Sequence, residues 1–418
     1  MSSELIDRVE EHFRKGEWKL LEDASAELMA RAEKTSLKRL AEGFLSYARA
    51  RQKSEPREVI HLLGKAARSF RGVDELLYSV ATTERLLLLA TFDGENRGRH
   101  LKRLGEFSMN RFLRTGSGGD IRLAIEAFER ARESLSGGEL AEVELNLTFC
   151  YGSLAEVSDN PRGEYERVIA LCDELEERYS GNPAMLARLK MNRSAALQKL
   201  AGIVPEEAPR LLQEAARHCR EASHIFRGQG AHAQLVRALQ GLAEVYRQAS
   251  QLDKEYLEEF VRVKKEIAEL FSSAGYLARG ALEELEAALA EVELAFVRGD
   301  MGRLKSAVRE IERAGGTFRQ LGNAEELAHS LAAAGVAYRS MAQMSGDAEL
   351  LKRAAKSYEE ALLLFQKSGD ALNMLAVGAA LVRVCRELAE VTGGKEWADK
   401  ANALENEVRK ILRKKSKI

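Results

Sequence analysis

Residues 351–370 read LKRAAKSYEEALLLFQKSGD, and this stretch decides the fold. Its apolar residues recur every three to four positions, which is the spacing of one face of an α-helix. Ser368-Gly369-Asp370 then supplies turn residues that end a helix. The residues that would share the buried face are Ala354, Tyr358, Ala361 and Phe365.

The same pattern recurs toward the N-terminus at a nearly fixed period. From residue 226 onward, a phenylalanine followed four residues later by glycine occurs four times, and successive phenylalanines are 45, 47 and 47 residues apart. Tyr179 and Leu135 continue the series. Such a period predicts a helical repeat array. The four pairs are Phe226 with Gly230, Phe271 with Gly275, Phe318 with Gly322, and Phe365 with Gly369.

Length and composition agree with a repeat array. At 418 residues the chain is longer than one compact core usually supports, whereas a solenoid has no such limit. Only five residues are proline, and strong helix formers dominate. The sequence therefore predicts an all-α chain. Its regular helix pairs are expected at 120–136 with 139–157, 161–180 with 183–201, 205–227 with 231–250, 253–272 with 275–298, 300–319 with 323–344, and 347–367 with 370–392.

Three regions are expected along the chain. Residues 1–115 form irregular N-terminal helical repeats, because an additional helix near 98–113 lengthens the period there. Residues 116–392 form the regular array of helix pairs, and residues 393–418 form a C-terminal capping helix with a basic tail. Gly116–Asp120 is expected to be a flexible linker, with Asp120 as the N-cap of the next helix.

Charge and cysteine usage indicate a soluble cytoplasmic protein. The formal net charge is −1, so no global field directs the chain to nucleic acid or to a membrane. The four cysteines are far apart and form no CxxC, which is typical of buried, reduced thiols. The N-terminal MSSELIDRVEEHF carries acidic residues where an export signal has basic ones.

Several local motifs resemble tetratricopeptide repeats. The triads Ala124-Phe128-Ala131 and Ala354-Tyr358-Ala361 match the second helix of that repeat, and Gly335 with Tyr338 matches the first. The segment 192–202 is similar to the opening of a first helix. The resemblance covers 120–392 well and 1–115 loosely, and it implies a right-handed superhelical solenoid of antiparallel helix pairs.

The repeat differs from that family in length. The family repeat has about 34 residues, whereas this one is nearer 46. Lengthened repeats of this kind resemble the arrays of soluble attachment-protein adaptors and of some large regulatory ATPases. The family's clamp for peptide carboxylates needs Lys, Asn and Arg at set positions over three helices. Only Asn192 matches, so that activity is not carried over.

Four clusters of residues are candidate sites. His218, Cys219, His224 and His232 lack the spacing of a zinc site, and packing is the favoured interpretation. Gly116–Asp120 lacks the Lys and Ser/Thr of a phosphate loop. A solvated helix face is the favoured interpretation of the acidic stretch Glu283, Glu284, Glu286, Glu291 and Glu293. A solubilising tail is favoured for Arg409, Lys410, Arg413, Lys414, Lys415 and Lys417.

No catalytic or metal motif is recognised, and no cofactor is expected. The sequence predicts a non-enzymatic scaffold or adaptor that binds a partner peptide or helix in its concave groove. Two alternatives stay open: a nucleic-acid-associated repeat protein that uses the basic tail, and a regulatory domain that senses a small ligand. By the family analogy, the groove-facing polar contacts would be Arg188, Asn192, Gln198, Gln240, Arg339 and Arg383.

Overall fold

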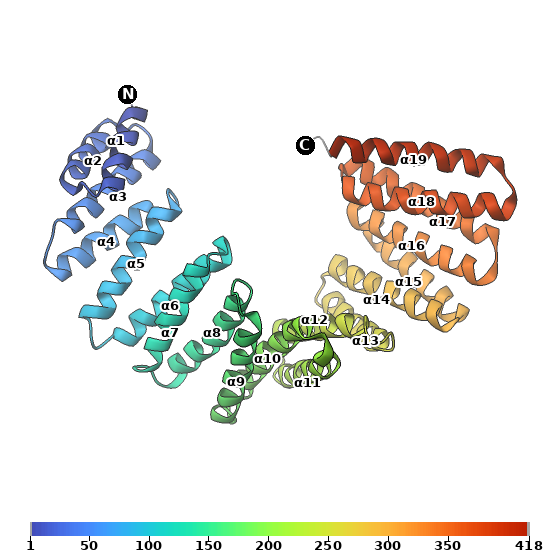
Figure 1. Cartoon of the computed structure of the whole chain (residues 1–418), viewed down its shortest axis with the longest axis horizontal. Helices are drawn as coiled ribbons and strands as arrows, with labels where there is room; N and C mark the ends of the chain where they lie inside the picture. Colours follow the sequence, from blue (N-terminus) through green and yellow to red (C-terminus); the bar gives the residue numbers. More distant parts are fainter. Residues whose placement is uncertain (1, 416–418) are drawn as a thin grey trace. The chain divides into compact units, whose positions relative to one another are not determined.

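The computed structural model describes residues 2–415, with side chains for residues 4–406. This part of the chain is helical and contains no strand (Figure 1). It divides into two compact units, residues 1–179 and 180–418. The first unit contains α1 (Ser2–Lys15), α2 (Trp18–Arg31), α3 (Thr35–Arg51), α4 (Pro56–Phe70), α5 (Glu75–Phe92), α6 (Arg97–Thr115), α7 (Gly118–Arg132), α8 (Gly137–Ala155) and α9 (Pro161–Arg178).

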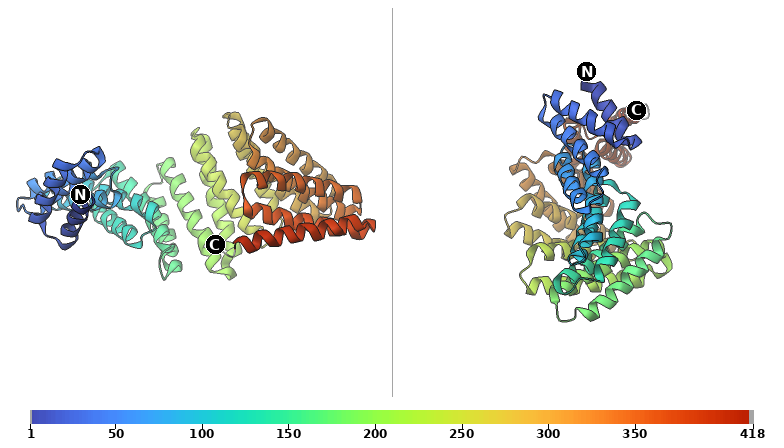
Figure 2. Two further views of the ribbon diagram at one scale, coloured as in Figure 1. Left: turned by 90° about the horizontal axis from the view of Figure 1, so that it is seen from above. Right: turned by 90° about the vertical axis from the view of Figure 1, so that its left-hand side faces the viewer.

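The second unit follows the same plan. It contains α10 (Pro183–Ile203), a 3₁₀ turn (Pro205–Glu207), α11 (Ala208–Gly228), α12 (His232–Ala249), α13 (Tyr256–Ser273), α14 (Leu277–Arg298), α15 (Met301–Gln320), α16 (Ala324–Ser345), α17 (Ala348–Ser368), α18 (Ala371–Thr392) and α19 (Lys395–Lys415). Within each unit a helix packs mainly on the helices before and after it in the chain (Figures 1 and 2). The expected all-α array of antiparallel helix pairs is confirmed.

Several helix ends lie where the sequence predicts them, because their capping residues act locally. The side chains of Asn160 and Asn182 accept hydrogen bonds from the backbone N–H groups of Gly163 and Met185. Gly369 ends α17 with a φ of +74°, a left-handed conformation that glycine adopts without steric cost. Short connections then force each helix to run back along its predecessor.

Close contacts between glycine and an aromatic ring join three helix pairs. In each, a glycine of one helix faces an aromatic ring of the next: Gly43 faces Phe70, Gly105 faces Phe128, and Gly335 faces Tyr358. A Cβ on Gly335 would lie 2.7 Å from the Tyr358 ring, so only glycine fits there. Small residues thus let the helices approach, as the sequence pattern predicts, and large rings fill the space between their turns.

Three of the four marker phenylalanines belong to the core. Phe318, Phe365 and Phe226 are buried, with exposed fractions of 0%, 1% and 3%. Phe271 is only half-buried and packs edge-on against Tyr276, with 6.3 Å between the ring centroids. The period therefore marks equivalent positions along the array, but their burial depends on the neighbouring helices.

The predicted linker at Gly116–Asp120 is wrong in detail. Helix α6 ends at Thr115 with Gly116 in the left-handed conformation, and α7 already begins at Gly118. Asp120 is not the N-cap, because it lies inside the first turn of α7. Its carboxylate is 3.2 Å from Arg111 Nη2 and accepts a hydrogen bond from Thr115 Oγ1 at 3.2 Å. Asp120, which the local sequence pattern assigns to the N-cap, pairs instead with two side chains of α6.

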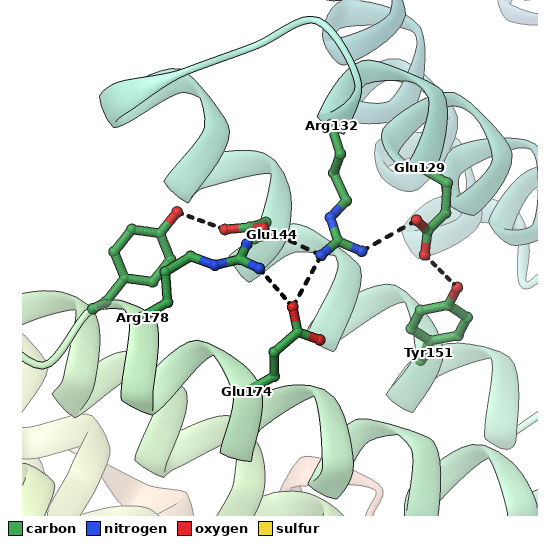
Figure 3. A network of polar contacts seen from close by, with 7 residues as sticks. Glu129, Arg132, Glu144, Tyr151, Glu174 and Arg178 are labelled. Atoms are coloured by element: carbon green, nitrogen blue, oxygen red, sulfur yellow. Dashed lines mark hydrogen bonds and ion pairs between the residues drawn. The ribbon is translucent and has the colours of Figure 1, made fainter.

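A buried network of charges joins the last three helices of the first unit (Figure 3). Glu144 on α8 has no exposed surface. Its carboxylate pairs with Arg132 of α7 at 3.2 Å and with Arg178 of α9, and it accepts a hydrogen bond from Tyr179 at 2.5 Å. Because a buried carboxylate requires such partners, the network holds α7, α8 and α9 in one arrangement.

A tyrosine clamp recurs in both units. Tyr151 of α8 donates a hydrogen bond to Glu129 of α7 at 2.8 Å, and the Arg167 guanidinium of α9 lies 4.0 Å above its ring. In the second unit, Tyr338 of α16 donates to Glu312 of α15. The guanidinium of Arg353 on α17 lies 4.1 Å above the Tyr338 ring. The two sets of three helices are therefore equivalent in side-chain chemistry as well as in packing.

Candidate functional site

An apolar groove lies in the second unit, between α14, α16 and α18. Its volume is about 390 Å³. Leu285 and Leu289 of α14 line it together with residues of α16, α17 and α18. Helices α14 and α16 contact each other directly although α15 separates them in sequence. The groove therefore lies where two helices that are not consecutive in the chain meet.

Small side chains create the hollow. Ala332 of α16 and Ala376 and Ala380 of α18 line the groove where larger residues would fill it. Its base includes Tyr358 of α17, whose ring sits against Gly335 and is 3% exposed. Val336 lies in the opening and is 43% exposed. The result is an apolar depression that stays open to solvent.

Two arginines of the groove differ in their partners. Arg339 of α16 makes a forked ion pair with Glu387 of α18, with Nε to Oε distances of 3.0 and 3.1 Å. This hydrogen bonding raises the pKa of Arg339. Arg383 of α18 is exposed, and no carboxylate among the described residues pairs with it. Arg339 is therefore fixed in place, whereas Arg383 has a guanidinium free for another group.

The Tyr358 hydroxyl does not supply a base near neutral pH. Burial raises its pKa to about 12, although the nearby charges of Arg339 and Arg383 oppose the shift. His329, at the groove, packs edge-on against Phe365 with 5.0 Å between ring centroids. The chemistry available here is apolar contact and charge pairing.

The structure brings together two of the six predicted contact residues. Arg339 and Arg383 both line the groove, although 44 residues separate them in sequence. Arg188, Asn192 and Gln198 lie on α10 and Gln240 lies on α12, and none of these four lines it. Arg188 and Gln240 are exposed, while Asn192 and Gln198 are half-buried.

Sequence reasoning missed the apolar residues that form the groove. The missed set is Leu285, Leu289, Ala332, Val336, Ala376 and Ala380. Each one belongs to an apolar helical pattern that also fits an ordinary core. The available signal was the alanine-rich composition of 332–337 and 376–380, where small residues recur on two helices of the same layer.

The acidic stretch on α14 is engaged within the chain, which corrects its interpretation as a simple solvated face. Glu283 is buried and pairs with Lys264 at 2.6 Å, as does Glu286. Glu284 pairs with Arg313, Glu291 with Arg303, and Glu293 with Lys254. These carboxylates fasten α14 to α13, to α15 and to Lys254 in the loop before α13, so they are not a free surface for a basic partner.

The remaining candidates are dispersed. His218 is buried, whereas His224 and His232 are exposed. Among the described residues, no group of three or more His, Cys, Asp or Glu side chains could hold a metal ion. The four cysteines are buried and unbridged, and burial raises the pKa of the Cys150 thiol to about 12.

The side chains of the basic tail lie outside the described residues. None of the helices in the described range is sufficiently long and apolar to cross a membrane.

Comparisons by sequence give no match. No protein-family model matches the chain, and no curated protein does.

Solved structures that are similar to the chain are helical repeat proteins of low sequence identity. One is a signal-transduction ATPase with a tetratricopeptide repeat sensor from Pyrococcus horikoshii. It is 15% identical with a TM-score of 0.47, and the match covers 94% of this chain and 55% of that one. The chain thus spans about half the length of that protein.

Two others are smaller. A Rap protein complexed with competence and sporulation factor is 12% identical, with a TM-score of 0.32, over 85% of this chain and 99% of that one. The nuclear import adaptor Nro1 of S. pombe is 12% identical, with a TM-score of 0.33, over 74% of this chain and 99% of that one. By its own antiparallel helix pairs and glycine–aromatic contacts, the chain is an all-α helical repeat array.

Proposed function

We propose that this protein is a non-enzymatic scaffold that binds a partner protein in the groove between α14, α16 and α18. The observation that carries the proposal is the open apolar groove itself. Its volume of about 390 Å³ falls in the range of ~300–1,000 Å³ that is typical of ligand pockets. A repeat array presents such a surface on rigid helices, so little conformational entropy is lost on binding.

The groove favours a particular kind of partner segment. Its alanine floor and leucine wall match a large apolar side chain, because burying one contributes about 1.5–3 kcal/mol. Arg383 offers a free guanidinium at the same groove, and a guanidinium pairs best with a carboxylate. We therefore assign to the partner an apolar anchor residue with an acidic residue close to it, on a helix or an extended peptide.

A peptide selection on the full chain tests this assignment. Peptides displayed on phage would be selected on the protein and then measured against Val336→Glu, which places a charge in the groove. We expect at least about a tenfold loss of affinity, as for a residue in the centre of an interface. Leu363→Glu is the matched control, because Leu363 is an exposed apolar residue of α17 outside the groove.

A separate variant tests the proposed pairing of Arg383 with an acidic residue of the partner. Arg383→Gln should weaken selected peptides that contain an acidic residue, and it should leave peptides without one unchanged. Peptides that bind Val336→Glu and the unaltered protein equally well would place the binding surface elsewhere on the molecule.

The four predicted residues on α10 and α12 are proposed as further contacts for a long partner. Arg188→Ala combined with Asn192→Ala should then weaken a long partner more than a short peptide that fills only the groove. Removal of residues 409–418 should leave the binding of the long partner and of the short peptide unchanged. Loss of binding on that truncation, with nucleic acid as the ligand, would instead favour the alternative in which the basic tail carries the function.

A further inference from the structure

A separate depression lies in the second unit, between α15, α16 and α17. Its volume is about 510 Å³, and it shares no lining residue with the groove between α14, α16 and α18. Helices α15 and α17 both pack on α16 but have little direct contact with each other. Helix α16 contributes Tyr338 and Met341 to the depression and Val336 and Arg339 to the groove, so the two hollows lie on different faces of this helix.

Apolar side chains form much of the lining of the depression. Val308 of α15 and Met341 of α16 are buried residues of the core. Met301 of α15 and Leu350 of α17 pack against the same core but are only half-buried, so part of each side chain is uncovered. Methionine side chains are flexible and adapt to the shape of an apolar group. Such a group bound here would remove this surface from water.

Two cations that line the same depression have no partner within the described part of the chain. Lys305 and Arg309 stand one turn apart on α15, and both are exposed. No carboxylate of the described residues lies within ion-pair distance of either side chain. The adjacent Glu310 pairs with Lys265 instead, at 3.1 Å. Like charges one turn apart on a helix repel each other, so an anion bound between them would remove that repulsion.

The other charged groups of the depression are engaged with their neighbours. Glu312 of α15 accepts a hydrogen bond from the Tyr338 hydroxyl and lies 3.5 Å from the Arg353 guanidinium of α17. Arg353 also donates a hydrogen bond to Tyr338. Asp347, the N-cap of α17, accepts a hydrogen bond from the backbone N–H of Glu349 at 2.9 Å. The lining therefore carries three cations and two carboxylates, and the unpaired charge is positive.

We propose that this depression binds a small amphiphilic anion. The apolar body of the ligand packs on Val308 and Met341, and its oxyanion head group lies between Lys305 and Arg309. The head group is a carboxylate or a phosphate ester, because ammonium and guanidinium groups donate charge-assisted hydrogen bonds to both. The volume of the depression falls in the range of ~300–1,000 Å³ that is typical of small-molecule sites. This site and the partner groove are independent of each other.

Nuclear magnetic resonance of methionine methyl groups in the full chain tests the site directly. Met301 and Met341 line the depression, and no methionine lines the partner groove. The protein, labelled with carbon-13 in these methyl groups, is titrated with octanoate, octyl phosphate and uncharged octanol below the concentrations at which micelles form. We expect the Met301 and Met341 signals to shift and saturate with octanoate, octyl phosphate or both. Met185 of α10, outside the depression, should not shift. Met301→Leu and Met341→Leu assign the two signals by removing them.

Removal of the two unpaired cations tests the recognition of the head group. Lys305→Gln combined with Arg309→Gln should weaken binding of the anion about tenfold, as expected for two solvent-exposed charge pairs. Arg319→Gln combined with Lys356→Gln is the matched control, because it removes the same two residue types and the same charge. Arg319 of α15 and Lys356 of α17 are exposed, lie outside the depression and have no ion-pair partner among the described residues. The control should leave the affinity unchanged.

The three ligands and one further variant decide between the outcomes. Saturation by octanoate alone identifies the head group as a carboxylate, and saturation by octyl phosphate alone identifies it as a phosphate ester. Octanol that binds as tightly as the anions, or no shift with any of the three, would overturn the proposal. So would equal affinities of the double variant and its control.

Val336→Glu, which alters only the partner groove, separates this site from the proposed function. It should leave the shifts of Met301 and Met341 intact, whether or not it loses selected peptides. Loss of these shifts in Val336→Glu would place the anion in the partner groove and overturn the assignment to the depression.

Discussion

Removal of the Glu144 carboxylate is the sharpest test of how the first unit is held together. Glu144→Gln keeps the size of the side chain and deletes its charge. It leaves Arg132 and Arg178 without their shared buried carboxylate, and it leaves Tyr179 with at most a neutral amide oxygen as acceptor (Figure 3). Breaking one side of a buried ion pair costs about 3–5 kcal/mol in general.

The surroundings of the two arginines reduce this expected cost. Arg178 is 43% exposed in its side chain and keeps Glu174 at 2.7 Å, while Arg132 keeps Glu129 at 3.3 Å. Water and the remaining carboxylates therefore compensate part of the loss. We expect Glu144→Gln to lower the free energy of unfolding of this unit by about 2–3 kcal/mol.

Glu174→Gln supplies the comparison within the same network. Its side chain is 51% exposed, although it contacts the same two arginines. An exposed pair contributes at most about 1 kcal/mol, so this variant should cost clearly less than Glu144→Gln. Both substitutions delete one carboxylate charge beside the same two arginines; they differ in burial and in the hydrogen bond that Glu144 accepts from Tyr179.

Hydrogen exchange by mass spectrometry is the appropriate assay, because an array of repeats does not unfold in one step. Glu144→Gln should speed exchange in α7, α8 and α9 and leave the second unit unchanged. Equal effects of Glu144→Gln and Glu174→Gln, or faster exchange spread evenly over the chain, would refute the reasoning that burial gives the network its strength.

Three further predictions concern packing and pH. Phe365→Ala should cost about 3–5 kcal/mol with faster hydrogen exchange confined to α16–α18, and uniform exchange would argue for one compact core instead. Gly335→Ala should destabilise by about 1–3 kcal/mol in denaturant titrations because its Cβ meets the Tyr358 ring, whereas Gly316→Ala, with open space around it, should stabilise slightly. Burial and nearby arginines lower the pKa of His218 from 6.5 to about 4, so its contribution to stability is complete above pH 6.5 and is lost as pH falls toward 4. His218→Leu should therefore flatten the pH dependence of unfolding in that window, and an unchanged slope would contradict the assignment.

The sequence by itself determined the helices and their order. Helix period, Asn caps at Asn160 and Asn182, and glycine stops such as Gly369 act over a few residues, so they can be recognised without knowing the fold. The repeat period near 46 residues likewise predicted the array, because equivalent positions recur in equivalent environments. The helix Pro183–Ile203 agrees with the expected range 183–201 to within two residues, because local residues set where this helix begins and ends.

Only the tertiary structure decided which residues meet. The groove brings Leu285, Val336 and Arg383 together from three helices that are about 50 residues apart in sequence, and an alanine stripe looks the same whether it is covered or open. Asp120 pairs with Arg111 instead of capping its helix, since a neighbouring helix supplies a stronger partner than the local backbone. Helix formation depends on neighbours in sequence, whereas burial, pairing and open surface depend on neighbours in space.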